Sequence, residues 1–142
     1  MDNNFKEHLE AKILYNPEDS EALILLGALE FVKFHQVKPA TKILKKALQQ
    51  DPQNINARFW LAVCSYYFLD YQEAEKILIE AINLDRTRAD CLSLLAYLNW
   101  DRKSSLENSL SYLKQAIHIN PDWPMLRVES IYEPIPNKLT TS

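Results

Sequence analysis

The sequence predicts an all-α protein built from repeated helix pairs. In one stretch after another, apolar residues recur at three- and four-residue spacing, the pattern of helices that bury one face. The chain has one glycine in 142 residues, as expected of a mostly helical protein, because glycine weakens helix interiors. Its small and large residues also return at a fixed period, and the joints between successive pairs are 35, 34 and 35 residues apart. These joints read Asn16-Pro17, Asp51-Pro52, Asp85-Arg86 and Asn120-Pro121.

The N-terminal stretch, residues 1–16, is predicted to be a helix from Asp2 to Tyr15 that caps the first repeat. Its apolar positions are Phe5, Leu9, Ile13 and Leu14. A terminal unit of a helical array needs a polar outer face, which four charged residues supply. They are Lys6, Glu7, Glu10 and Lys12.

Three repeats are predicted to follow, over residues 17–51, 52–85 and 86–121. The first begins with a helix that Asp19 or Ser20 caps and that runs to about Phe34, and its second helix covers residues 38–49. In the later repeats the predicted capping or preceding residues are Asn54, then Thr87 or Arg88, and then Ser104 or Ser105.

Small residues are placed where two helices of a repeat would meet. The first helices carry a large residue followed by a small one: Leu26-Gly27, Leu61-Ala62 and Leu95-Ala96. The second helices carry a small residue four positions before a large one, and another small one seven positions on: Ala40, Leu44 and Ala47; Ala74, Leu78 and Ala81; Ser109, Leu113 and Ala116. Small side chains let helix backbones come close, and large ones fill the remaining space.

After Pro121 the pattern changes. Asp122 is positioned to cap a short helix over 122–133 with Pro124 in its first turn, and this helix would cover the last repeat. Its apolar stripe would be Met125, Leu126, Val128 and Ile131. Pro134 would end it, and residues 134–142 are predicted to form a disordered tail. In an alternative prediction, residues 131–135 fill a groove of the same chain or of a neighbour.

The spacing of these pairs resembles the tetratricopeptide repeat, whose period is about 34 residues. The resemblance covers residues 17–121 and is closest in the middle repeat. It implies a right-handed superhelix of three helix pairs. The sequence departs from the family pattern at the expected first-helix tryptophan, at the inter-helix glycine and at one alanine. The residues found there are Leu23, Arg58 and Leu92, then Leu69, and Ser109.

No motif for catalysis, a cofactor or a metal is found, so the sequence predicts a non-enzyme without cofactors. The single glycine excludes phosphate-binding loops, and His8, His35 and His118 belong to three different elements. Cys64 and Cys91 lie in apolar helical stretches and are expected to be buried free thiols.

The net charge limits the kinds of partner, and the lack of targeting or membrane-spanning segments bears on the location. The net charge of −3 and the pI of 5.6 argue against nucleic-acid and anionic-membrane partners. The N-terminus has no signal-peptide pattern, and the apolar run over residues 22–29 is too short to span a membrane. We therefore expect a cytoplasmic protein.

The resemblance implies that the first helices of the repeats line a concave groove that holds a peptide. By position, the groove residues would be Glu21, Ile24, Ala28, Phe31, Val32, Asn56, Phe59, Val63, Tyr66, Tyr67, Asp90, Ser93, Tyr97, Trp100 and Asp101. Aromatic residues prevail, which favours an apolar or amphipathic segment bound as a helix or an extended strand. Phe59 and Tyr67 are expected to be exposed. Trp60, Phe68 and Tyr66 are candidates for the interior.

Two functional hypotheses follow. The first is a protein-binding module, either an adaptor or a small client-shielding chaperone. In size and groove character it is similar to type III secretion chaperones. The second is a structural subunit that uses the same face to form a homodimer or a larger assembly. A carboxylate-clamp co-chaperone is not expected, since none of the matching positions is basic: Ile24, Ala28, Trp60, Asp90 and Leu94.

Overall fold

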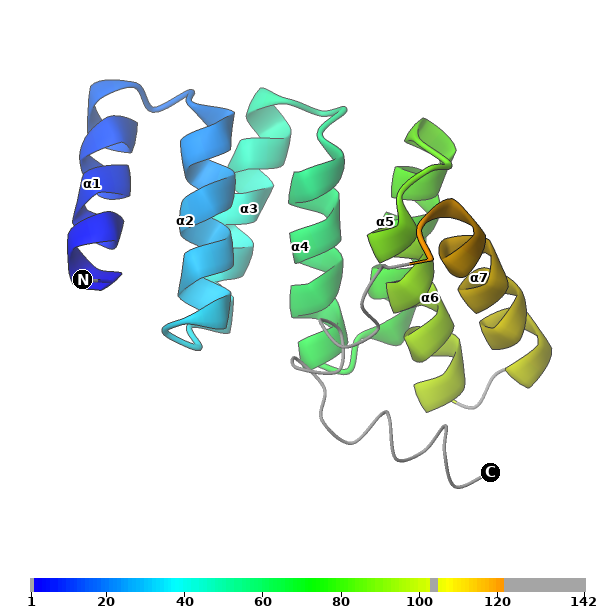
Figure 1. The fold of residues 1–142 in the computed structure, drawn as a ribbon. Coiled ribbons are helices and arrows are strands. Elements are labelled where there is room, and N and C mark those ends of the chain that lie inside the picture. The colour runs from blue at the N-terminus through cyan, green and yellow to red at the C-terminus, as the bar shows by residue number, and fades with distance from the viewer. Residues whose placement is uncertain (1, 103–104, 122–142) are drawn as a thin grey trace. The chain divides into compact units, whose positions relative to one another are not determined.

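A computed structural model describes residues 2–102 and 105–121 (Figure 1). These residues form seven α-helices and no strand, so the predicted all-α class is confirmed. The helices are α1 (Asp2–Tyr15), α2 (Ser20–Val32), α3 (Val37–Gln50), α4 (Ile55–Tyr67), α5 (Tyr71–Leu84), α6 (Ala89–Asp101) and α7 (Leu106–Ile119). The predicted helix over 122–133 and the predicted tail lie outside the described residues.

The chain divides into two compact units, with the boundary inside α5. In the N-terminal unit (Met1–Ile77), α1 packs on α2, α2 packs on α3, and α4 contacts both α2 and α3 (Figure 1). In the C-terminal unit (Leu78–Ser142), α6 and α7 pack against each other. None of the helices in the described residues is long and apolar enough to cross a membrane.

Three helices begin with a capping side chain that was among the predicted caps. Asp19 Oδ1 accepts a hydrogen bond from the Ala22 amide at 3.0 Å, and Asn54 Oδ1 accepts one from the Ala57 amide at 3.0 Å. Ser105 Oγ does the same for the third amide of α7 at 3.0 Å. Each bond satisfies a backbone N–H that the helix itself leaves without a partner. In contrast, α6 follows Arg88, whose side chain makes no capping bond.

The glycine of the chain lies where α2 and α3 come closest. A Cβ atom added to Gly27 would be 2.6 Å from Cγ and 2.8 Å from Cδ2 of Leu44, a side chain with no exposed surface. Because Leu44 fills the space that a Cβ would need, only glycine fits there without a shift of the helix pair.

We expect Gly27→Ala to lower the free energy of unfolding by about 1 kcal/mol. Overpacking typically costs about 1–3 kcal/mol, and the better helix propensity of alanine offsets about 1 kcal/mol of this. Urea denaturation measures the change. In a Leu44→Ala background the clash is absent, so there Gly27→Ala should stabilise the fold. A stabilising effect in both backgrounds would show that the contact is not a constraint.

Two turns between helices use the left-handed backbone conformation at residues other than glycine. His35 has φ 55° and Leu69 has φ 63°. The following amides donate back into the preceding helices, Gln36 to the Glu30 carbonyl at 2.8 Å and Asp70 to the Ser65 carbonyl at 2.9 Å. These bonds satisfy carbonyls at the helix ends, but the Cβ of His35 or Leu69 makes the backbone conformation costly.

Replacing Leu69 with glycine should stabilise the fold by about 1 kcal/mol, because glycine removes the cost of the left-handed conformation. Little packing is lost, since Leu69 is 67% exposed. Thermal or urea unfolding provides the measurement. The neighbouring Phe68 has φ −81°, so Phe68→Gly serves as a control that should destabilise.

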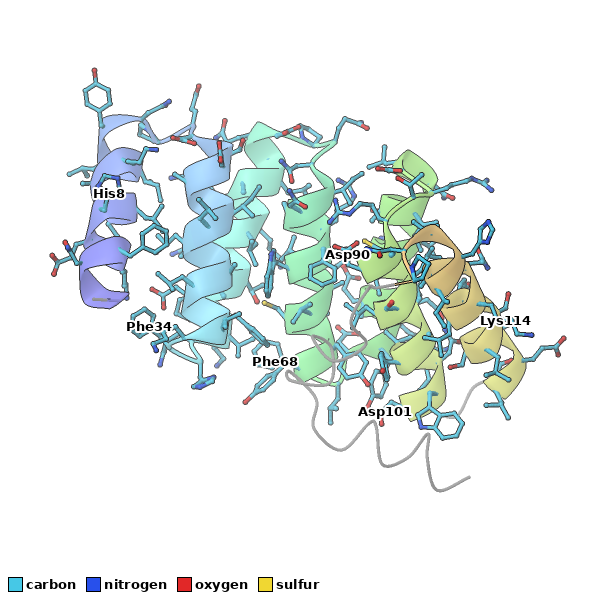
Figure 2. The ribbon with its side chains drawn as sticks, viewed as in Figure 1. His8, Phe34, Phe68, Asp90, Asp101 and Lys114 are labelled. Atoms are coloured by element: carbon cyan, nitrogen blue, oxygen red, sulfur yellow. The ribbon has the colours of Figure 1, made fainter. Side chains whose placement is uncertain are left out.

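An ion pair and apolar contacts hold α1 on α2. Lys6 Nζ lies 2.7 Å from Oε1 of Glu30, a buried carboxylate, and 4.9 Å from the centroid of the Phe34 ring. Figure 2 labels Phe34. Leu9 packs beside this pair, in a cluster with Ala22, Leu26, Ile13, Leu29 and Ile43. The hydrogen bond to Glu30 is the main cause that raises the pKa of Lys6 above its ordinary value of 10.5.

Alkaline pH should therefore weaken the docking of α1. A lysine whose pKa is raised by folding stabilises the folded state fully below pH 10.5, and this contribution disappears as the pH rises through the folded-state pKa. The urea midpoint of the wild type should fall more between about pH 9 and about pH 11.5 than that of Lys6→Arg, which stays charged. Equal losses in the two proteins would mean that the pair does not contribute.

The C-terminal unit contains a hydrogen bond that the family pattern did not predict. Ser109 Oγ, at a position where the pattern has alanine, donates to the Ala96 carbonyl at 2.7 Å and is buried. It links α7 to α6 within a small-residue contact. An apolar cluster lies in the same unit and consists of Ala89, Leu92 and Ala116, with Ile82 and Tyr112 packed against them.

Candidate functional site

Five aromatic side chains form a connected set on α2 and α4 of the N-terminal unit. We call this set the aromatic surface: Phe31 of α2, with Phe59, Trp60, Tyr67 and Phe68 of α4 or its C-cap. Phe31 bridges the two helices, because its ring centroid is 6.4 Å from Trp60 and 5.8 Å from Tyr67, the latter at an interplanar angle of 89°.

The remaining ring contacts run along α4. Phe59 and Trp60 are 5.4 Å apart at 80°, and Tyr67 and Phe68 are 6.1 Å apart at 78°. Such edge-to-face pairs contribute about 0.5–1.5 kcal/mol each beyond their buried area. Trp60 and Tyr67 are seven residues apart and therefore lie on one face of α4, two turns from each other. The rings hold one another in place across the two neighbouring helices.

Within the aromatic surface, exposure increases toward the C-terminal end of α4. Phe31 is 7% exposed and Phe59 and Trp60 are half-buried, whereas Tyr67 is 56% and Phe68 is 49% exposed. Figure 2 shows Phe68 at this end of α4. Three further apolar neighbours in sequence are Val32, Leu69 and the half-buried Phe34. Exposed apolar side chains that gather in this way are typical of interaction surfaces.

These positions correct part of the sequence-based assignment. Tyr67 is exposed as predicted, and Tyr66 is buried at 3% as the interior alternative had it. Phe68 was a candidate for the interior but is exposed. The helix α4 ends at Tyr67, so Phe68 is the residue after the helix and does not continue its buried face. Phe59, expected to be exposed, is half-buried since the Trp60 ring packs against it.

The other predicted residues of the N-terminal unit differ in accessibility. Ile24 and Val63 are buried, at 8% and 1%, and the buried Tyr66 places its ring 5.6 Å from Tyr71. Ala28 is half-buried and Asn56 is exposed. Of this group, Asn56 is the side chain that solvent reaches freely, one turn before Phe59 and Trp60 on α4.

In the C-terminal unit, the predicted residues are Asp90, Ser93, Tyr97, Trp100 and Asp101. Ser93 is fully buried and Asp101 is half-buried. Asp90 is engaged by Arg88, whose Nε and Nη2 lie 3.0 and 2.6 Å from its two carboxylate oxygens, and it also accepts the Cys91 amide at 2.9 Å. This fork geometry is the strongest form of ion pair between side chains. Tyr97 is 1% exposed and Trp100 is half-buried.

Neither thiol is suited to chemistry. Cys64 and Cys91 are free and buried, as the sequence predicted, and burial raises the pKa of both thiols. A buried neutral thiol is a poor nucleophile and a poor metal ligand. Among residues 2–102 and 105–121, no three His, Cys, Asp or Glu side chains are grouped as a metal ion would require.

The sequence analysis did not assign Phe68 and Leu69 to the predicted groove, although both are exposed. A helix-end signal existed in the Leu69-Asp70 turn, but the direction of the two side chains depends on the left-handed backbone at Leu69. Phe31 bridges α2 and α4 because these two helices lie close together. The periodicity of the sequence does not predict the distance between them.

Comparison with known proteins connects this architecture to a family. A family model described as tetratricopeptide repeat matches residues 33–98. No curated protein matches the sequence at a significant level.

Solved structures share the fold over most of the chain. A crystal structure of MamA has a TM-score of 0.71 at 21% identity and covers 83% of this chain and 68% of its own. A second MamA structure, labelled MSR-1 C2, has a TM-score of 0.64 at 26% identity, with 82% and 66% covered. YrrB, described as a TPR protein with an unusual peptide-binding site, has a TM-score of 0.71 at 25% identity, with 88% and 63% covered. This chain thus spans about two thirds of the length of these proteins.

Proposed function

Because this chain belongs to the tetratricopeptide-repeat family, we propose that it is a non-catalytic module that binds an apolar or amphipathic peptide segment of another protein. The observation that carries the proposal is the aromatic surface. Its inner rings are fixed by one another, while about half of the Tyr67 and Phe68 side chains is left exposed. YrrB, a fold relative, is described as having a peptide-binding site, which supports a peptide as the ligand.

The physical chemistry of the surface specifies the kind of peptide. None of the five side chains of the aromatic surface is charged. An apolar face of the ligand could therefore cover them without burying an unpaired charge. Tyrosine and tryptophan present large, stiff surfaces that lose little conformational entropy when they bind, and they are frequent at binding hot spots. The exposed Asn56 adds an amide that can bond to a peptide backbone at the Phe59 and Trp60 end of the surface.

The predicted groove residues contribute to this proposal in different ways. Phe31, Phe59 and Tyr67 would contact the ligand, as would Asn56. Ala28 is half-buried and would form part of the floor. The buried residues of the same unit would shape the surface from beneath rather than touch the peptide: Ile24, Val63 and Tyr66. The predicted groove residues of the C-terminal unit, Asp90, Tyr97 and Trp100, are not assigned to this surface.

The test is the affinity of a peptide selected for binding to the full chain from a library of amphipathic sequences. We expect Tyr67→Ala to raise its Kd about tenfold or more, as for a hot-spot aromatic residue, and Phe68→Ala to raise it less. Both side chains are about half exposed, so the fold should persist. Fluorescence anisotropy with a labelled peptide measures the Kd.

Leu14→Ala is the matched control, because Leu14 is an 86% exposed apolar residue of the same unit outside the aromatic surface. Its Kd should equal that of the wild type. A Kd that changes equally in Tyr67→Ala and Leu14→Ala, or in neither, would refute the assignment of the surface.

The second candidate function is self-assembly through the same surface. The observation that favours it is the run of exposed apolar residues at the ends of α2 and α4, Val32, Tyr67, Phe68 and Leu69, which a second copy would also cover. The molecular mass in solution distinguishes the two. A monomer over the whole concentration range supports peptide binding, and a dimer that Tyr67→Ala dissociates supports self-assembly.

The finer role and the location also belong to the proposal. An adaptor or a small chaperone similar to those of type III secretion fits a surface that shields an apolar segment. A cytoplasmic location agrees with two buried cysteines that remain free thiols, because such compartments keep thiols reduced.

A further inference from the structure

Four lysines form a stripe along α3. We call this set the lysine stripe, and all four side chains are exposed: Lys38, Lys42, Lys45 and Lys46. Their spacing of four, three and one residues keeps them on one face of the helix, over about 12 Å of its length. This face is opposite the side of α3 that packs on α2 and α4 (Figure 1), where Ala40, Leu44 and Ala47 have no exposed surface.

No acidic residue balances the lysine stripe. The helix α3 contains neither Asp nor Glu. Among residues 2–102 and 105–121, no carboxylate forms an ion pair with any of the four ammonium groups. Two other cations of the chain are paired, Lys6 with Glu30 at 2.7 Å and Arg88 with Asp90 at 2.6 Å. The lysine stripe is therefore a positive face that is open to solvent.

The lysine stripe does not stabilise α3. Like charges three or four residues apart repel each other on a helix, and Lys42 has such neighbours in Lys38, Lys45 and Lys46. Lys38 also lies in the first turn, where the helix dipole disfavours a cation, and no side chain caps this end of the helix. Residues that weaken their own helix without a compensating contact are typical of functional sites.

The other repeats lack this stripe at the matching positions. When Ala40 is matched with Ala74 and Ser109, the positions of the four lysines hold Gln72, Lys76, Ile79 and Glu80 in α5, and Glu107, Ser111, Lys114 and Gln115 in α7. Both of these helices carry the two signs of charge. The lysine stripe is therefore a property of α3 and not of the repeat.

The remainder of the N-terminal unit is acidic. Outside α3, residues 1–77 contain eleven acidic and five basic residues. A nucleic acid or an anionic membrane presents phosphates over a wide area, which these carboxylates would repel, and a pI of 5.6 is not typical of proteins that bind them. The stripe also consists of lysine alone, whereas arginine is the preferred partner for bidentate phosphate contacts. A short acidic segment of a protein would match the stripe without facing the surrounding carboxylates.

We propose that the lysine stripe binds an acidic segment of a partner protein, with three or four carboxylates spaced along about 12 Å. Lysine ammonium groups act as point charges on flexible stems, so they can reach the carboxylates of a helical or an extended segment. The stripe shares no residue with the aromatic surface, and the proposal does not rest on the peptide-binding function. It also differs from a carboxylate clamp, whose matching positions lie on the first helices of the repeats.

Fluorescence anisotropy with a labelled, alanine-based peptide tests the interaction in the full chain. The peptide carries four glutamates at the spacing of the lysines, and its control has glutamines in their place. We expect Lys42→Gln/Lys46→Gln to raise the Kd of the glutamate peptide about fivefold or more at low salt, because two exposed charge pairs are lost. The glutamine peptide should not bind. No binding of the glutamate peptide, equal binding of both peptides, or an unchanged Kd in the double variant would overturn the proposal.

Lys12→Gln/Lys76→Gln is the matched control, since it removes the same charge from exposed positions of the same unit outside α3. Its Kd should equal that of the wild type. Both double variants should fold, because glutamine and lysine have similar helix propensities and all four side chains are exposed. Tyr67→Ala should also leave this Kd unchanged, which separates the lysine stripe from the aromatic surface.

Further probes identify other ligands of the stripe. A single-stranded oligonucleotide, or a vesicle of phosphatidylcholine and phosphatidylserine, could bind more tightly than the glutamate peptide and lose this binding in Lys42→Gln/Lys46→Gln. That result would overturn the proposal in favour of a nucleic acid or a membrane. A dimer at low salt that the same variant dissociates would show instead that acidic residues of a second copy cover the stripe.

Discussion

The helix α3 must bury two faces at once, one against α2 and one against α4. Leu44 shows the constraint most clearly, since it fills the space beside Gly27 on α2 and lies on the side of α3 that α4 covers. A helix with two buried faces cannot be stable alone, so each pair depends on the helix that follows. Stability in such arrays is built from contacts between neighbours along the chain, and the two ends need special treatment. At the start, α1 supplies only the face that contacts α2, and its remaining surface is largely exposed.

Departures from the repeat pattern are accommodated by local chemistry. Leu69 and His35 adopt the left-handed backbone that glycine would adopt without strain, because the helix-end carbonyls would otherwise lack their hydrogen bonds. Ser109 occupies an alanine position, and its hydroxyl finds the Ala96 carbonyl across the helix contact. Lys6 was predicted to lie on the polar outer face of α1 but instead faces α2, where it pairs with the buried Glu30. In each case a buried or terminal polar group has a partner, which is the condition for keeping it inside the fold.

The different packing of the first and second helices of a repeat also explains why the aromatic surface lies on α2 and α4. The second helices provide most of the small-to-large packing, and this leaves one side of α2 and α4 free to carry aromatic residues. These rings are not isolated on the surface, since Phe31 links the two helices through its contacts with Trp60 and Tyr67. If this surface binds a peptide as proposed, rings that are already held in place would lose less entropy on binding, which would favour affinity.

The sequence by itself determined the helices and their order. Asn54 was predicted as a cap, and Asp19 and Ser105 were each one of two adjacent candidates, because capping is a property of a few consecutive residues. The period of 34–35 residues separated one pair from the next. The bidentate pair of Asp90 with Arg88, the exposure of Phe68 and the bridge made by Phe31 were decided only by the tertiary structure. Each of them depends on backbone torsions at a helix end, on side-chain rotamers or on the distance to a helix about 35 residues away. Hydrophobic spacing states which face of a helix is apolar, whereas the neighbours packed on that face decide how much of it remains accessible.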